Sequence, residues 1–148
     1  MMKIGIAADH AGYAYKEALK EYLQAKGLEV VDFGTHSPDS TDYADYAHPL
    51  AEAVGSGQLK WGIALCGSGE GMCMTTNKHP HVRAALVWNE EVAAITRKHN
   101  DANILCLPAR FVSLEDARRM VEVFLNTEFE GGRHLRRINK IDYEASMS

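Results

Sequence analysis

The sequence predicts an α/β protein: a doubly wound, Rossmann-like three-layer sandwich with a five-stranded parallel sheet and an extending C-terminal helix. Two patterns lead to this expectation. Short apolar runs recur along the chain, and between them the apolar residues fall three or four positions apart, as they do in helices. Strands that alternate with helices form a parallel sheet covered on both faces. The chain has 148 residues, of which 46% are hydrophobic, so a single globular domain over residues 1–148 is expected.

Each expected element follows from its local residues. Five apolar runs are the expected strands: residues 3–8, 28–33, 61–66, 83–87 and 103–107. Helical spacing predicts helices over residues 15–23, 43–54, 90–98 and 114–125, with a helix of about two turns after Gly71 and a last one over about 132–145.

Single residues mark where several of these helices begin or end. Gly27 ends the first helix, since glycine readily adopts the left-handed conformation found at helix C-termini. Pro49 indicates that the regular part of the second helix begins shortly before it, where a missing N–H costs little. Asn89 and Ser113 are residue types that cap helix N-termini. Gly131–Gly132 separates the fifth helix from the last one.

The composition excludes several classes of function. The formal net charge is −4, so no general attraction to nucleic acid or to an anionic membrane is expected. No apolar run approaches the roughly 20 residues of a membrane span, and no secretory signal is visible. The three cysteines (Cys66, Cys73 and Cys106) are odd in number and widely spaced, which argues against a disulfide framework and for a reducing, cytoplasmic setting.

The charge is unevenly distributed along the chain. From Gly131 onward the net charge is +2, whereas the first 130 residues carry −6. On a helix, Arg133 and Arg137 lie one turn apart on one face, with Leu135 and Ile138 on roughly the opposite face. Because guanidinium groups match phosphate oxygens, this tail favours a local anion site. A solvated basic face is the alternative interpretation.

In a doubly wound sheet, ligands bind beyond the carboxyl ends of the strands. The residues at these positions are Asp9–His10, Asp42–Tyr43, Cys66–Gly71, Trp88–Asn89 and Pro108–Arg110. Asp9 and His10 are of types that contact a sugar hydroxyl and a ligand phosphate. Equally, Asp9 can serve only as a helix cap and His10 only as a first-turn residue.

The most informative stretch is Cys66-Gly67-Ser68-Gly69-Glu70-Gly71. Glycines let the backbone approach a ligand and turn its N–H groups toward one point, and the following helix adds a positive dipole end that favours an oxyanion. The same surroundings favour the thiolate form of a cysteine, which is the better base or nucleophile. The alternative is a buried cysteine at a strand end followed by a tight turn. The run does not match G-x-G-x-x-G or a P-loop, and Met72 stands where a cysteine phosphatase loop needs arginine.

Histidines supply the remaining candidates. His99 and Asn100 lie in a polar run between a helix and a buried strand, and imidazole moves protons near neutral pH; a polar connector is the alternative. His79 and His81 flank a proline but lack a third ligand nearby, so no metal site is predicted. Cys73 and Cys106 are expected in the core.

Taken together, these motifs resemble the family of type B ribose-5-phosphate isomerases, which includes galactose-6-phosphate isomerase subunits. The residues that carry the resemblance are Asp9-His10-Ala11-Gly12, Gly34-Thr35, Thr41-Asp42-Tyr43, Cys66-Gly67-Ser68-Gly69, Asn77-Lys78, Arg83-Ala84, His99-Asn100-Asp101-Ala102-Asn103 and Glu130-Gly131-Gly132-Arg133-His134 through Arg137. The resemblance implies interconversion of D-ribose 5-phosphate and D-ribulose 5-phosphate through an enediolate, with no metal and no cofactor. It also implies a homodimer or homotetramer with the active site between subunits, and the C-terminal helix packed on a partner.

The resemblance further implies roles for single residues. Cys66 is the base, and the oxygen of the enediolate is held by Ser68 and the amides of Gly67, Gly69, Glu70 and Gly71. His99 opens the furanose ring. The sugar hydroxyls contact Asp9 and Tyr43, with Asn100 nearby, and the phosphate binds His10, Arg110, Arg133 and Arg137. Many relatives carry a small apolar residue in place of Glu70, whose carboxylate is expected to point to solvent.

Two alternatives remain open. The substrate can instead be a six-carbon sugar phosphate, such as allose or galactose 6-phosphate, because the residues that line C4 to C6 cannot be ranked from sequence. The fold can also serve a non-catalytic sugar-phosphate-binding module. Such a module is expected to lose Cys66 or His99 and to keep the arginines, whereas both residues are present here.

Overall fold

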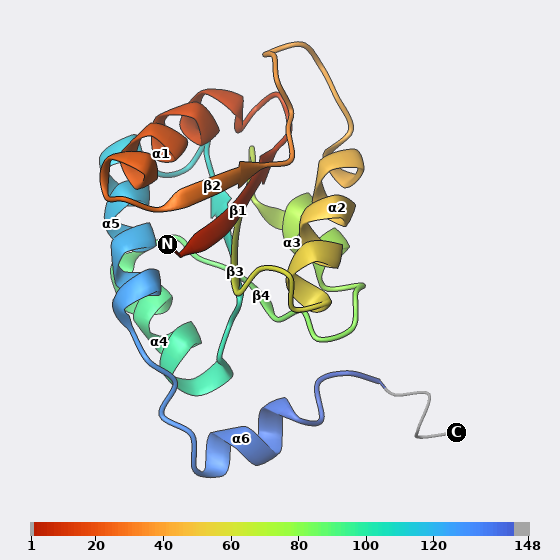
Figure 1. The fold of residues 1–148 in the computed structure, drawn as a ribbon, viewed down its shortest axis with the longest axis vertical. Helices are drawn as coiled ribbons and strands as arrows, with labels where there is room; N and C mark the ends of the chain where they lie inside the picture. Colours follow the sequence, from red (N-terminus) through yellow and green to blue (C-terminus); the bar gives the residue numbers. More distant parts are fainter. Residues whose placement is uncertain (1, 144–148) are drawn as a thin grey trace.

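The computed structural model describes residues 2–143 and contains a parallel five-stranded sheet with helices on both faces (Figure 1). The strands are β1 (Lys3–Ala8), β2 (Glu29–Asp32), β3 (Trp61–Cys66), β4 (Ala84–Leu86) and β5 (Ile104–Pro108). Their order in the sheet is β2-β1-β3-β5-β4, and every neighbouring pair is parallel. The order reverses direction at β1, as in a doubly wound sheet, which confirms the predicted fold class.

Six helices are seen among the described residues. They are α1 (Tyr13–Ala25), α2 (Tyr43–Gly55), α3 (Glu70–Thr76), α4 (Glu90–Asn100), α5 (Leu114–Asn126) and α6 (Arg133–Ile138). Helices α1, α4 and α5 cover one face of the sheet, and α2 and α3 cover the other (Figure 1). None of the helices in this part of the chain is long and apolar enough to span a bilayer.

Side-chain alternation along the strands decides which layer each residue meets. In β3, Ile63 and Leu65 belong to the cluster under α1, α4 and α5, whereas Ala64 and Cys66 belong to the cluster under α2 and α3. All six residues of β3 are buried, as expected for the central strand of a parallel sheet. The thiol of Cys66 therefore faces the α2–α3 layer.

The expected helix caps at Asn89 and Ser113 are confirmed. Asn89 Oδ1 accepts a hydrogen bond from the N–H of Val92 at 2.8 Å, and Ser113 Oγ accepts one from the N–H of Asp116 at 3.0 Å. The helix predicted over residues 43–54 is confirmed as α2, but the later start of its regular part, inferred from Pro49, is wrong because α2 is regular from Tyr43. The helix tolerates the proline because this side is exposed, so water can reach the carbonyl group that receives no N–H.

The last helix is shorter than the expected 132–145, since α6 ends at Ile138. Tighter turns replace it: the N–H of Lys140 donates to the carbonyl oxygen of Arg137 and that of Ile141 to Ile138. Asp142 then accepts a hydrogen bond from the N–H of His81 at 3.0 Å, which ties the chain to the loop after α3. Residues 144–145 lie outside the described part of the chain.

A buried ion pair joins α1 to the end of β2. Lys16 is fully buried, and its Nζ lies 2.6 Å from Asp32 Oδ2 and 2.6 Å from Glu17 Oε2. Burial alone would raise the pKa of Asp32, but hydrogen bonds from Lys16, the N–H of Gly34 and Lys20 outweigh it and lower that pKa. The same carboxylate thus fixes the first residues of the loop that leads to α2.

Replacing Asp32→Asn is expected to lower the free energy of unfolding by about 3 kcal/mol at neutral pH, because it leaves the buried ammonium group of Lys16 without its main partner. A carboxyl group whose pKa is lower in the folded protein than in the unfolded chain stabilises the fold at pH values above its unfolded pKa. This stabilisation is lost as the pH falls through the pKa of the group in the folded protein. The difference between wild type and variant, measured by urea unfolding, should therefore shrink below about pH 4. Glu17→Gln is the control, since that carboxylate is 44% exposed. An equal loss in both variants would contradict this reading.

Candidate active site

The glycine-rich loop after β3 is held at the carboxyl edge of the sheet. The carbonyl oxygens of Cys66 and Gly67 accept hydrogen bonds from the N–H groups of Ala109 and Arg110 at 2.9 and 3.0 Å. Because these donors directly follow β5, the ends of the two neighbouring strands are joined. The Cys66 side chain sits at the start of this loop and is 4% exposed.

Two glycines, Gly69 and Gly71, bring other elements close to this loop. Gly69 adopts a φ of +76°, and a Cβ there would lie 2.6 Å from Leu86 Cδ1, so only glycine fits between the ends of β4 and β5. A Cβ at Gly71 would lie 2.6 Å from the ring of Tyr43. The predicted neighbours Tyr43 and Gly71 are therefore in contact.

The loop also contacts a predicted phosphate ligand. A Cβ at Gly67 would lie 3.2 Å from the Arg110 guanidinium, which places that group directly over the loop. Ser68 Oγ accepts a hydrogen bond from the N–H of Glu70 at 3.3 Å, which leaves the hydroxyl proton for a ligand. The Glu70 side chain is exposed, as expected.

Asp9 and His10 follow β1, next to the end of β3. The N–H of Asp9 donates to the carbonyl oxygen of Leu65 at 3.2 Å. Its Oδ1 accepts from the N–H groups of Ala11 and Gly12 at 2.9 and 3.1 Å, which is the local capping role foreseen as the alternative. Asp9 is nonetheless 6% exposed, and its second carboxylate oxygen is not used by this turn.

His10 supports the loop that leads to α2. Its Nδ1 accepts a hydrogen bond from the N–H of Thr41 at 3.1 Å, so Nε2 remains available to donate to an anion. Beside it, the Thr41 hydroxyl is buried and has no hydrogen-bond partner within the described chain. A buried hydroxyl of this kind is a candidate ligand contact that our sequence reasoning did not single out.

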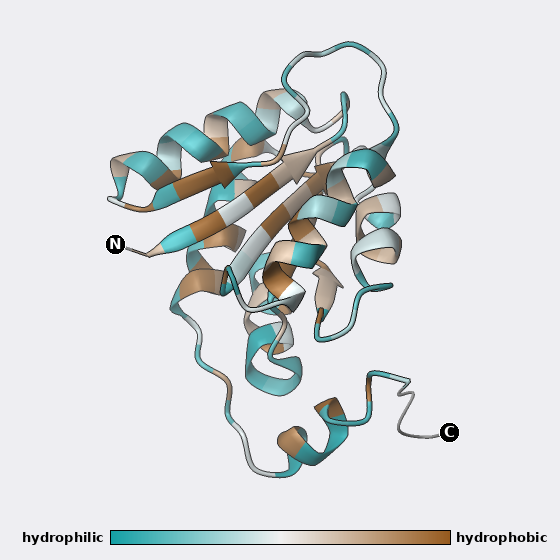
Figure 2. Ribbon diagram, turned by 45° about the vertical axis from the view of Figure 1, so that its right-hand side comes forward, coloured by the Kyte–Doolittle hydropathy of each residue, from teal (hydrophilic) through white to brown (hydrophobic). Residues whose placement is uncertain are grey.

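The other four predicted site residues lie elsewhere. His99 and Asn100 end α4, and Arg133 and Arg137 lie on α6. Helices that connect parallel strands run back along the sheet, so α4 ends near the amino ends of the strands. Figures 1 and 2 show α6 beyond these amino ends. It lies away from the arrowheads, which mark the carboxyl ends of the strands, where the glycine-rich loop follows β3. A single chain therefore does not bring these residues to Cys66.

The two arginines keep the geometry that the sequence predicts. Arg133 and Arg137 are both exposed and lie one turn apart on α6. On the same segment, Leu135 and Ile141 are 49% and 51% exposed, so this chain leaves their apolar surface uncovered. Figure 2 shows hydrophobic positions, in brown, on α6 and on the segment that follows it.

His99 forms a compact cluster with two residues that the sequence reasoning did not treat as ligands. Its ring stacks on His134 with centroids 4.3 Å apart and planes at 13°. The nearest Glu130 oxygen lies 3.8 Å from Nε2 of His99 and 3.5 Å from Nε2 of His134. Burial, then the charges of His99 and Arg133, lower the pKa of His134. The i, i+4 spacing of Glu130 and His134 was the signal in the sequence.

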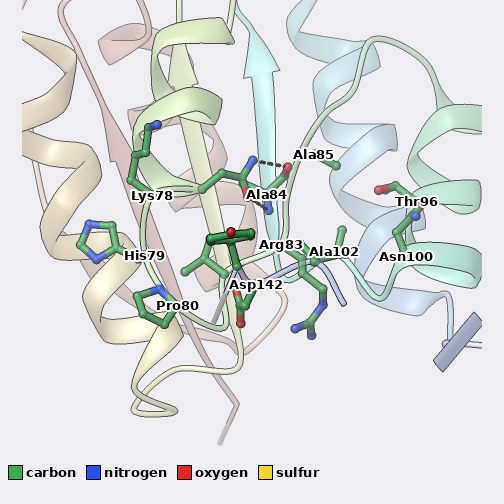
Figure 3. A pocket seen from close by; sticks show the side chains of 14 residues that line it. Lys78, His79, Pro80, Arg83, Ala84, Ala85, Thr96, Asn100, Ala102 and Asp142 are labelled. Atoms are coloured by element: carbon green, nitrogen blue, oxygen red, sulfur yellow. Dashed lines mark hydrogen bonds between the residues drawn. The ribbon is translucent and has the colours of Figure 1, made fainter. Parts of the chain in front are cut away.

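A cavity of about 710 Å³ lies beside the open edge of β4 (Figure 3). Its lining residues that carry charge or hydrogen-bonding groups include Asn77, Lys78, Arg83, Asn100 and Asp142. The Asn77 amide pairs with the backbone of Ala84, at 2.9 Å through Nδ2 and 2.8 Å through Oδ1, and so satisfies part of the strand edge. Asn100 is the sole predicted site residue among those lining this cavity.

The two other cysteines pack beneath the loop. Cys106 is fully buried, as expected, and its pKa is raised by a hydrogen bond with Cys73 and by burial. Cys73 is only half-buried and its thiol donates to the carbonyl oxygen of Ala84 at 3.5 Å. His79 pairs with His48 at 2.8 Å, and the described chain adds no third metal ligand there.

The fold and this arrangement define a class: a doubly wound α/β protein with a thiol and a glycine-rich loop at the carboxyl edge of its sheet, and with paired arginines on an outlying helix. The profile of the Ribose/Galactose Isomerase family matches residues 4–141. The chain belongs to the ribose/galactose isomerase family.

Relatives of known structure and name agree over nearly the whole chain. Ribose-5-phosphate isomerase B of Escherichia coli is 39% identical over 141 residues, covering 95% of each chain. A ribose 5-phosphate isomerase structure from Thermotoga maritima has a TM-score of 0.94 at 48% identity and covers 97% of this chain and 99% of its own. A structure of ribose-5-phosphate isomerase B from Mycoplasma genitalium with bound ribulose-5-phosphate has a TM-score of 0.91 at 44% identity, covering 95% and 93%.

Proposed function

We propose that this protein is an aldose–ketose isomerase that interconverts D-ribose 5-phosphate and D-ribulose 5-phosphate, and that residues 1–148 form one isomerase domain. The observation that carries the proposal is the Cys66 thiol at the head of the glycine-rich loop. Tyr43 contacts this loop at Gly71, and the N–H of Asp9 is hydrogen-bonded to Leu65, the residue before Cys66. The likeness to named ribose-5-phosphate isomerases supports the five-carbon substrate. We infer that the reaction needs neither metal nor cofactor, and that the protein acts in the cytoplasm.

The chemistry requires a base and a stabiliser for negative charge, because the proton next to a sugar carbonyl is only weakly acidic. In the proposed mechanism the Cys66 thiolate removes the proton from C2 of the open-chain aldose, and the electron pair moves onto the C1 oxygen to give an enediolate. A proton then passes from the C2 hydroxyl to the C1 oxygen. The thiol returns its proton to C1 while the electrons on the C2 oxygen form the new carbonyl, which gives the ketose without change in oxidation state overall. Loop amides and the Ser68 hydroxyl donate to the enediolate oxygen, and losing one such donor costs on the order of 10²–10³ in rate.

The remaining groups position the substrate. The free carboxylate oxygen of Asp9 and the Tyr43 hydroxyl accept from or donate to sugar hydroxyls. His10 and Arg110 bind the phosphate from the same chain, which holds C1 and C2 against Cys66.

We propose that a second copy of the chain completes the site, in a homodimer or homotetramer. Two observations support this. Arg133 and Arg137, a pair suited to bind phosphate, lie near the amino ends of the strands, far from Cys66 of the same chain. The segment that carries them also has exposed apolar residues. In the complex, Arg133 and Arg137 reach the phosphate bound by the other copy. His99 then meets the furanose ring oxygen and opens the ring by proton transfer, with Asn100 nearby.

Cys66→Ala is expected to lower kcat for ribose 5-phosphate by at least about 10³-fold, because no other base replaces the thiol. The far-UV circular dichroism and the Tm should remain close to wild type. Cys73→Ala is the matched control: this thiol is half-buried on α3 and has no role in the mechanism, so its kcat should stay within about threefold. Full activity of the Cys66→Ala protein would remove Cys66 as the base. A panel of five- and six-carbon phosphates in the same assay decides the substrate.

His99→Asn is expected to lower kcat by about 10²-fold through slower ring opening. Deuterium at C2 reports which step limits the rate. Where proton removal at C2 limits the wild-type reaction, the isotope effect on kcat should fall toward one in the variant, since ring opening then limits turnover. An undiminished isotope effect with a reduced kcat would assign His99 to the proton-transfer step instead.

Mixed oligomers test the shared site. Cys66→Ala and Arg137→Ala proteins are each expected to be weakly active. After the two are mixed and refolded, half of the dimers contain one chain of each kind. In such a dimer, one of the two sites has both a native Cys66 and a native Arg137. Activity should recover to about a quarter of the wild-type value, given random pairing. Mixing Cys66→Ala with the Cys66→Ala, Arg137→Ala double variant is the control and should give no recovery. Mixed dimers seen by native mass spectrometry without recovery would place the site within one chain.

A further inference from the structure

Glu130 and His134 form a cluster with His99 and have no role of their own in the proposed isomerase mechanism. One ligand atom from each side chain lies within 4.8 Å of the other two. Two imidazoles and one carboxylate are the ligands of many zinc sites that keep a fourth position for water. We propose that these three residues bind a divalent transition metal ion, Zn²⁺ in the first place, and that the bound ion inhibits the isomerase.

The distances are close to those of a metal site. Zinc binds nitrogen and carboxylate oxygen at about 2.0–2.2 Å, so tetrahedral ligand atoms lie roughly 3.4 Å apart. Here the Glu130 oxygen is 3.5 Å from Nε2 of His134 and 3.8 Å from Nε2 of His99. The ring of His99 is 40% exposed, so it can turn its nitrogen out of the stack toward an ion.

His134 gives an independent reason to expect a ligand. Its Nε2 is buried and has no hydrogen-bond partner in the described chain, although the residue is only 6% exposed. Buried polar atoms are normally paired, because leaving one unpaired is costly.

The backbone holds the three ligands in place. The N–H of Glu130 donates to the carbonyl oxygen of Lys98 at 3.1 Å, which fixes the carboxylate beside the last turn of α4. Glu130 and His134 are four residues apart, at the start of α6. The charges around the cluster are mixed, since Arg133 and Arg137 act on His134 as cations and Glu130 as an anion. The arginines disfavour a second cation, so a micromolar Kd is expected rather than the tighter binding of structural zinc.

The inhibitory effect rests on the proposed function, in which His99 transfers a proton to the ring oxygen. An Nε2 atom that coordinates zinc can neither accept nor donate a proton. Zinc is therefore expected to block ring opening, and a chelator to restore it.

Metal binding is measured first, on the wild-type protein and without an activity assay. Calorimetric titration with ZnCl₂ should give one site per chain, and Co²⁺ should give visible absorption bands typical of tetrahedral coordination. His134→Gln and Glu130→Gln should each weaken binding at least tenfold. Glu128→Gln, an exposed carboxylate on the same segment, is the matched control and should bind like wild type.

Three outcomes would overturn the proposal. Binding that survives in His134→Gln but is lost in His48→Gln would assign zinc to the His48–His79 pair. Binding lost only in Cys66→Ser would assign it to the thiol. No binding below 1 mM Zn²⁺ would exclude a site altogether.

The inhibitory part is tested separately. In the isomerase assay, the zinc concentration that halves the activity should match the Kd from calorimetry, and EDTA should reverse the loss. Zinc that binds at the cluster without affecting turnover would refute the inhibition. A protein that binds zinc as predicted but lacks isomerase activity would instead count against the proposed function alone.

Discussion

The common direction of the five strands is the constraint on which the site depends. Parallel strands bring all their carboxyl ends to one edge, so Asp9, Cys66 and Arg110 meet there although they lie far apart in the sequence. The same constraint sends every connecting helix back to the opposite edge. His99, at the end of α4, therefore cannot reach Cys66 of its own chain. A second copy is the simplest way to join the two groups, which makes assembly part of the proposed active site.

Within the carboxyl edge, close packing of the backbone decides how precisely the site is formed. Gly69 fits between the ends of β4 and β5 only because it has no side chain and tolerates a positive φ. Gly71 allows the Tyr43 ring to lie on the first turn of α3. The glycines thus do more than expose amides to a ligand, since they also set how near Tyr43 and Arg110 come to the backbone of the loop.

Sequence reasoning predicted the parallel sheet, its five strands and the clustering of Cys66, Asp9 and Arg110, because periodicity and strand direction are local patterns with few alternatives. It was wrong on the length of the last helix. The spacing of Ile138 and Ile141 favours a longer helix, but Asp142 accepts a hydrogen bond from the backbone of His81, which is 61 residues away in the sequence. No local pattern reveals this contact. The unpaired Thr41 hydroxyl and the burial of His134 also depend on three-dimensional packing, so they could not be predicted.

The segment from Glu130 to Arg137 combines two opposite demands on charge. Arg133 and Arg137 face outward, where positive charge favours an anion, while His134 turns inward on the intervening positions of the same helix. The charges of Arg133 and Arg137 contribute to lowering the pKa of His134. An anion bound by the arginines offsets their positive charge and so weakens their repulsion of a cation near His134. Anion binding on the outer face and cation binding on the inner face therefore favour one another, and by linkage the coupling is reciprocal. A short helix of alternating exposure can therefore place a phosphate site and a metal site back to back without the two excluding each other.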